Sequence, residues 1–334
     1  MTFDERVQAI VKRKFTPRQA RFLVMVMLHS GVCMRRQYCA FARIVHGHVD
    51  RLFFERMTAE KIATAFDAAH HRARIYHVRH RALYHAIGEP HSRHRKPLPL
   101  ARAVEHLMLL DAILARPEVT WLATERDKLA HFSHRVGHVL QRDEFPHLVF
   151  GDAPNTTTRY FPDGLPIGVE AEHRGYLFVY LVTREIPIDF RPFLLRHAEL
   201  LRALPHWTIQ LLVPTHLATA SETYAAAAWE ELADPLRPQV IDELRWFFRE
   251  QRRLSSADQA AESVDLCRYR SARQAFSAPR YRVLYRTWMR IGDRAISALG
   301  SRVLRDALER QTGRIESIAL PRPYLHLSSL VGTA

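Results

Sequence analysis

The order of helix and strand signals in the first ninety residues is the feature that most constrains the fold. Thr16 can cap a helix and Pro17 suits its first turn, and the apolar residues within 20–28 recur at helical spacing. Gly31 interrupts the chain after this segment and Gly47 interrupts it again, so two further helices are expected, at 34–44 and 49–61. The sequence therefore predicts three consecutive short helices.

Two short strands are expected directly after the third helix. Residues 63–66 and 73–78 flank a polar tip, and the second segment alternates between polar and apolar side chains as a half-buried strand does. Three helices followed by a β-hairpin are typical of a winged helix-turn-helix, in which the third helix enters the major groove of DNA. We therefore expect a DNA-binding domain of this type over residues 1–90.

The positive charge of the chain is concentrated in the same region. Residues 1–100 hold 19 Lys and Arg against 7 Asp and Glu, whereas residues 101–334 hold 30 against 28. A local positive field favours a polyanion partner, and the absence of a long basic amphipathic helix favours double-stranded DNA over a membrane surface. The expected DNA contacts are basic side chains of the second and third helices, the hairpin and the segment after it: Arg35, Arg36, Arg43, His48, Arg51, Arg72, Arg74, Arg79 and Arg81.

A second part of the chain is expected to be α/β. Residues 91–156 are interpreted as a helical linker region, because 88–99 is rich in proline and basic residues and the following pattern is helical. Residues 157–334 are interpreted as a small sheet wrapped by helices. Near-continuous apolar strands at 176–182 and 207–213 flank an expected helix there, and a further pair of strands is expected within 157–170. The chain is expected to be mostly helical beyond residue 216.

Several short segments resemble the replication-relaxation family, proteins of plasmids and integrative elements related to the MobC-type class of conjugative relaxases. They are Thr16-Pro17-Arg18-Gln19, residues 73–78, Tyr160-Phe161-Pro162-Asp163-Gly164, residues 176–182 and residues 209–214. The resemblance implies a winged helix followed by a domain similar to PD-(D/E)xK nucleases, and a role in plasmid mobilisation.

The nuclease signature is incomplete in this chain. Such a site needs two or three carboxylates at adjacent strand ends to hold a divalent cation. Asp163 matches the first acid, but Tyr180 and Val182 stand where the second is expected, and Glu185 substitutes only if the strand is shifted. Asp163 and Glu185 are thus the only catalytic candidates, and we expect a degenerate, non-catalytic scaffold.

Other sequence features exclude common functional classes. The chain has no GxGxxG, P-loop, GxSxG or HExxH motif. Its cysteines, Cys33, Cys39 and Cys267, lack CxxC spacing, and no Cys/His set has the spacing of a zinc finger, so neither a metal site nor a cofactor is expected. The charged N-terminal stretch lacks the apolar segment of a signal peptide, which favours a cytoplasmic protein.

The leading hypothesis is a non-catalytic protein that binds double-stranded DNA in a mobile genetic element or an associated bacterial system. It would act as a transcriptional regulator or would mark an origin or transfer site. A homodimer is expected, because one small domain reads few base pairs. Two alternatives stay open: a divergent metal-dependent relaxase or nuclease, and a protein-interaction module that uses the winged helix.

Overall fold

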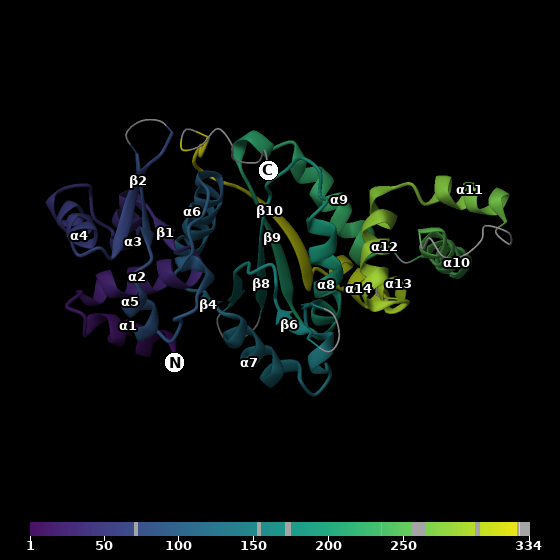
Figure 1. Cartoon of the computed structure of the whole chain (residues 1–334), viewed down its shortest axis with the longest axis horizontal. Coiled ribbons are helices and arrows are strands. Elements are labelled where there is room, and N and C mark those ends of the chain that lie inside the picture. The colour runs from purple at the N-terminus through teal and green to yellow at the C-terminus, as the bar shows by residue number, and fades with distance from the viewer. Residues whose placement is uncertain are drawn as a thin grey trace.

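The computed structural model describes residues 1–69, 73–151, 155–170, 175–234, 236–255, 265–297, 301–325 and 327. Within these residues the protein is a mixed α/β molecule with a high helix content and several small sheets (Figure 1). In this part of the chain no helix is both long enough and apolar enough to cross a bilayer.

The first 86 residues form an N-terminal unit of five helices and one small sheet. Its elements are α1 (Phe3–Val11), α2 (Pro17–His29), β1 (Val32–Cys33), α3 (Arg35–Ala42), α4 (His48–Ala59), β2 (Ala63–Asp67), β3 (Arg74–Val78) and α5 (Arg81–Ala86). The sheet is antiparallel with the order β1-β3-β2, so β3 lies between the two others. The three helices and the hairpin predicted from the sequence are confirmed, and β1 and α1 add to them.

Local sequence signals explain why these elements form. Thr16 accepts a hydrogen bond from the Gln19 backbone N–H, and the Gln19 side chain accepts one from the Thr16 N–H, which satisfies two free donors at the start of α2. Apolar faces of α2, α3 and α4 then meet in one core, where the rings of Phe22, Tyr38 and Phe53 pack edge-on or tilted against one another.

A five-stranded sheet forms the middle of the molecule. Its strands have the order β10-β9-β8-β7-β4: β4 (Thr120–Leu122), β7 (Ile167–Val169) and β8 (Tyr176–Leu181) are antiparallel neighbours, whereas β8, β9 (Trp207–Val213) and β10 (Gly313–Ala319) are parallel. Helix α8 (Phe190–Ala203) connects β8 to β9, as a parallel pair requires.

Strand β8 is buried on both sides, which explains its continuous run of apolar residues. Tyr176, Phe178 and Tyr180 face a core shared with α8, α7 (Glu125–Val136) and α9 (Ala220–Leu232), whereas Leu177 and Val179 face α6 (Leu100–Leu114). Helix α6 also packs against α2, α3 and β1, so it joins the sheet to the N-terminal unit (Figure 1).

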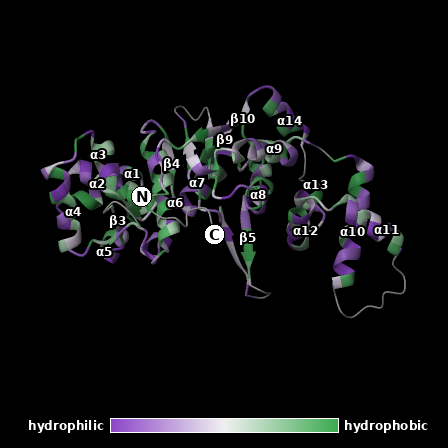
Figure 2. Ribbon diagram, turned by 90° about the horizontal axis from the view of Figure 1, so that it is seen from above, coloured by the Kyte–Doolittle hydropathy of each residue, from purple (hydrophilic) through white to green (hydrophobic). Residues whose placement is uncertain are grey.

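The remaining elements extend the molecule away from the N-terminal unit. A hairpin of β5 (His147–Phe150) and β6 (Thr157–Tyr160) projects from the body (Figure 2). Helices α10 (Pro238–Ser255), α11 (Leu266–Ala275), α12 (Pro279–Ile291), α13 (Arg294–Ser297) and α14 (Arg302–Glu309) follow α9, and α10 and α11 lie at the opposite end of the long axis from α4 (Figure 1). Single 3-10 turns occur at Arg93–Arg95, Arg142–Glu144 and Thr215–Leu217.

The structure differs from the sequence-based expectation in three places. The helical pattern expected within 91–156 is confirmed as α6 and α7, but a strand, β4, lies between them and pairs with β7 of the central sheet. The strands expected as a pair in 157–170 separate, because β6 pairs with β5 while β7 joins the central sheet. The C-terminal segment, expected to be helical, includes the strand β10, whose partner β9 lies about a hundred residues earlier.

Candidate nucleic-acid interface

A groove lies between the start of α3 and the β2–β3 hairpin. Its volume is about 770 Å³, and its lining includes Arg35, Arg36, His46, Asp67 and Arg74. The groove therefore brings three of the arginines predicted to contact DNA, from two separate elements, to one concave surface.

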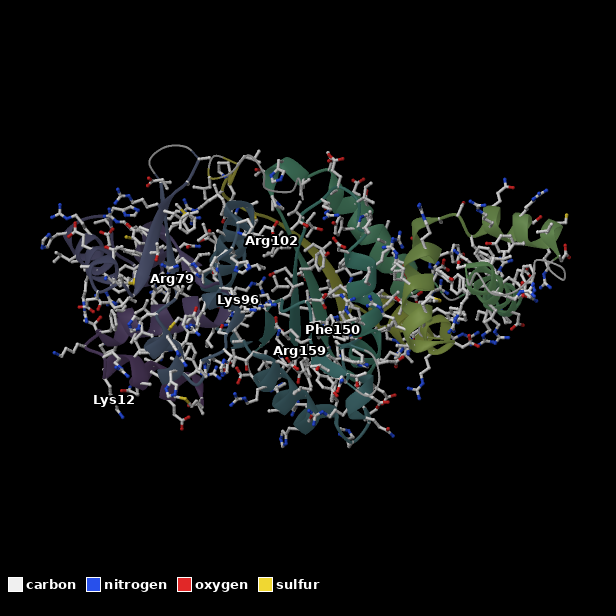
Figure 3. The ribbon with its side chains drawn as sticks, in the orientation of Figure 1. Lys12, Arg79, Lys96, Arg102, Phe150 and Arg159 are labelled. Carbon is white, nitrogen blue, oxygen red and sulfur yellow. The ribbon has the colours of Figure 1, made fainter. Side chains whose placement is uncertain are left out.

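Three predicted contact residues are exposed cations. Arg43 ends α3, Arg79 follows β3 and Arg81 begins α5, and within the described residues none of them forms an ion pair. Figure 3 shows Arg79 on the N-terminal unit, away from Phe150 and Arg159 on the β5–β6 hairpin. These guanidinium groups keep their full capacity to bind an external anion.

Three further predicted residues have only weak partners. Arg51 Nε lies 3.7 Å from Glu55 Oε1, its Nη2 lies 3.2 Å from His48 Nδ1, and Arg74 Nε lies 3.4 Å from Asp67 Oδ1. All of these groups are exposed, and ion pairs in water contribute at most about 1 kcal/mol. An incoming phosphate or base edge can therefore replace these partners at little cost.

Two predicted residues are engaged inside the protein. Arg36 donates two hydrogen bonds to Asp111 on α6, at 2.9 and 2.7 Å, and its guanidinium lies over the ring of Tyr324. Arg35 donates to the fully buried Asp50 at 2.8 Å. Arg36 thus joins the N-terminal unit to the rest of the molecule, and Arg35 joins α3 to α4. Arg72 lies outside the described residues.

Asp50 fixes the start of α4. Its Oδ1 accepts a hydrogen bond from the Gly47 N–H at 2.6 Å, and its Oδ2 accepts from Arg35. Burial alone would raise the pKa of Asp50, but these donors outweigh it and hold the pKa well below its ordinary value. The carboxylate is therefore ionised at neutral pH and stabilises the positive end of the helix dipole.

The outer face of α4 is less basic than the sequence suggested. Val49 and Leu52 on α4 are exposed by 61% and 48%, close in sequence to Arg51 and His48, and Val45 in the turn before α4 is exposed by 89%. A sequence pattern cannot separate these residues from the core positions of the same helix, because both sets are apolar. Such side chains can contact thymine methyl groups or a protein partner.

One of the two nuclease candidates, Asp163, lies in a second, larger cleft. It has a volume of about 1510 Å³ and runs between the 93–109 segment, the end of β8, α8 and α12–α13. Its lining includes eight arginines and six carboxylates, and five of these arginines pair with carboxylates of the same cleft. Most of the charge in this cleft is thus compensated internally.

The cleft does not bring the two candidate acids together as a metal site. Asp163 lines it and forms an ion pair with Arg196 of α8, while Glu185 is exposed beyond the end of β8. Tyr180 and Val182 are buried in the core. In the described part of the chain, Asp163 belongs to no group of three or more metal-ligating side chains.

A buried lysine lies behind Asp163. Lys128 of α7 donates to the Leu165 backbone oxygen at 2.6 Å and lies over the Phe161 ring. Burial, reinforced by the positive charge of Arg93, lowers the pKa of Lys128 to about 7. Three basic side chains, Arg196, Arg93 and Lys128, therefore interact with the Asp163 carboxylate.

No family model, curated protein or solved structure matches the chain.

Proposed function

We propose that the N-terminal unit is a winged helix-turn-helix that binds double-stranded DNA, with α4 in the major groove and the β2–β3 hairpin against the backbone. The observation that carries the proposal is the order α2, β1, α3, α4, β2, β3 around a β1-β3-β2 sheet, with exposed arginines on the same unit. The local excess of positive charge in residues 1–100 supports it.

The exposed residues divide into two roles under this proposal. Arg51 and His48, on the first turns of α4, would contact base edges. Arg43, Arg74, Arg79 and Arg81, from the end of α3, the hairpin and α5, would contact phosphates. Arg35 and Arg36, which have strong internal partners, would instead hold the reading surface in place.

We propose that the protein acts without catalysis, as a transcriptional regulator or as a binder of an origin or transfer site of a mobile element. The central sheet supports a degenerate PD-(D/E)xK-like scaffold, because three antiparallel strands are followed by a helix and a parallel strand. The compensation of Asp163 by Arg196, with no acid at Tyr180 or Val182, favours a structural role for this domain.

The test compares Arg51→Ala with Arg74→Ala in binding to the upstream DNA of the protein's own gene and to a random duplex. Loss of a base contact should cost about 1–3 kcal/mol on the specific site and little on the random one. Loss of a phosphate contact should weaken both equally and reduce the salt slope by about one. Arg273→Ala is the matched control, because this exposed arginine lies on α11 at the far end of the molecule (Figure 1). Equal effects of Arg51→Ala on both duplexes would contradict the assigned role.

One observation favours a second candidate function, the docking of a protein on α4. Val49 and Leu52 on α4, and Val45 in the turn before it, are exposed apolar side chains that DNA binding uses only in part. A Leu52→Asp substitution separates the two. If a protein is the partner, the wild-type protein binds no duplex at low salt, and Leu52→Asp abolishes binding of the protein partner. If DNA is the partner, the wild-type protein binds a duplex at low salt.

A further inference from the structure

The turn between α3 and α4 brings three different metal-ligating side chains together. Cys39 comes from α3, His46 from the turn and Asp50 from the first turn of α4. Their donor atoms, Sγ, Nδ1 and a carboxylate oxygen, all lie within 4.8 Å of one another. We propose that these three residues bind a divalent cation of the zinc type.

The distances between the donor atoms fit a tetrahedral ion. Cys39 Sγ lies 3.4 Å from His46 Nδ1, which in turn lies 3.3 Å from Asp50 Oδ2. Zinc binds sulfur at about 2.3 Å and nitrogen or oxygen at about 2.0 Å, so tetrahedral geometry places sulfur and nitrogen about 3.5 Å apart and nitrogen and oxygen about 3.3 Å apart. Two of the three donor–donor distances thus match a tetrahedral ion, and the third, between Cys39 Sγ and the Asp50 carboxylate oxygen, is within 4.8 Å.

The cluster does not have the geometry of a nucleophilic Cys-His-Asp triad. The same ring nitrogen, His46 Nδ1, is the atom nearest to both the thiol and the carboxylate. A nucleophilic Cys-His-Asp triad would use both ring nitrogens, one for each neighbour. A single nitrogen cannot at once accept from Cys39 and donate to Asp50. In the absence of an ion, the Cys39 thiol and the His46 Nδ1–H can each donate to the Asp50 carboxylate, and a bound cation would replace these two hydrogen bonds.

The surroundings support such a site. Arg35 and the Gly47 N–H hold the Asp50 carboxylate in place, as outer-shell donors do around metal ligands. Cys39 and Asp50 are buried, whereas the His46 side chain is 58% exposed and lines the groove beside α3. The ion can therefore enter from the groove, and water can supply a fourth ligand.

Bound metal would fasten α3 to the start of α4. Both ends of the α3–α4 turn and its middle supply a ligand, so the ion would fix the direction in which α4 leaves the turn. The consequence for DNA rests on the proposed function. Metal-loaded protein would bind its DNA site more tightly than metal-free protein, because an α3–α4 turn already held by the ion loses less conformational entropy on binding.

The experiment titrates chelator-treated, full-length protein with Co²⁺ alone and follows absorption. We expect one ion per chain, a thiolate-to-cobalt charge-transfer band in the near ultraviolet, and displacement of Co²⁺ by Zn²⁺. His46→Ala should weaken Co²⁺ binding at least tenfold, since even outer-shell partners are worth about 10–100-fold. His46 is exposed, so the variant should fold; His91→Ala and Cys267→Ser are matched controls that should bind Co²⁺ as the wild-type protein does.

The outcomes separate the metal site from the proposed function. Absence of the charge-transfer band in the wild-type protein, or a band that persists in Cys39→Ser, would overturn the metal site even if the protein binds DNA. A band lost in both His46→Ala and Cys39→Ser would establish the metal site even if no duplex binds, and the proposed function alone would then fail.

Discussion

At the scale of single residues, Lys128 is a lysine that the central domain removes from water. It is almost fully buried in α7, with the Leu165 carbonyl as its hydrogen-bond acceptor. Removal from water disfavours the charged amine, which explains why the pKa of Lys128 falls to about 7. The folded protein therefore holds fewer protons than the unfolded chain between pH 7 and about 10, where a free lysine titrates.

The contribution of Lys128 to the free energy of unfolding should therefore increase with pH in that range. We expect this contribution to increase the free energy of unfolding by roughly 2 kcal/mol between pH 7 and 9, and Lys128→Met to remove it. Urea titrations of both proteins at the two pH values measure the difference. Lys96 is exposed, so Lys96→Met should leave the pH dependence of stability unchanged. A pH dependence of Lys128→Met identical to that of the wild-type protein would show that Lys128 is charged in the folded protein.

At the scale of elements, the start of α2 depends on one side chain. Thr16→Ala removes the acceptor for the Gln19 N–H and should lower the free energy of unfolding by about 1 kcal/mol. Thr219 occupies the same position at the start of α9 but makes no capping hydrogen bond, so Thr219→Ala should change stability by less than about 0.5 kcal/mol. Denaturant unfolding measures both, and equal losses would contradict the role of the cap.

Signals confined to a few neighbouring residues made the N-terminal elements predictable. The capping residues around Thr16 and the strand-like pattern in 73–78 each act within one element, and the helix and the strand are both confirmed. The expected alternation of burial is wrong, because residues 75–78 of the central strand β3 are all buried. β10 was not predictable, because its alternating polar pattern alone does not specify a strand, and the segment becomes one by pairing with the distant strand β9. The same holds for residues 120–122, which become a strand only beside β7.

The candidate site was predictable in part for the same reason. The sequence identified exposed arginines such as Arg79, but it could not show that Arg36 pairs with Asp111, seventy-five residues away in the chain. It also gave no metal signal, because Cys39, His46 and Asp50 follow no finger spacing and meet only when α3 and α4 pack. Tertiary contacts decide which side chains are available for binding.

At the scale of the whole molecule, buried histidines should make the fold sensitive to acid. Burial lowers the pKa of His29, at the end of α2, to about 3 and that of His197, in α8, to about 4. Both are neutral in the folded protein, while an unfolded histidine takes up a proton near pH 6.5. Their contribution to stability is therefore complete above pH 6.5 and is lost as the pH falls towards 4.

We accordingly expect the midpoint temperature of thermal unfolding to decrease as the pH is lowered from 6.5 to 4.5, a range in which titration of carboxylates changes stability little. His197→Gln should make this decrease smaller. Thermal unfolding followed by circular dichroism measures both. His91→Gln, at an exposed histidine, should behave as the wild-type protein does. A midpoint that stays constant over this range would show that the buried histidines are protonated in the fold.

The proposed DNA-binding surface lies at one end of a long molecule, which leaves the opposite end free for a second function (Figure 1). A two-fold homodimer, which we propose as the DNA-bound form, would present two copies of α4 to successive major grooves. Sedimentation of the protein with and without its DNA site tests this arrangement. A single chain on the bound duplex would contradict it.

The most direct test of the central claim is fluorescence anisotropy of the full-length protein with the upstream DNA of its own gene and with a random duplex, across a salt series. The proposal predicts tighter binding to the upstream DNA and a steep decrease in affinity with salt, because arginine–phosphate contacts release counterions. The absence of binding to either duplex at low salt would contradict it.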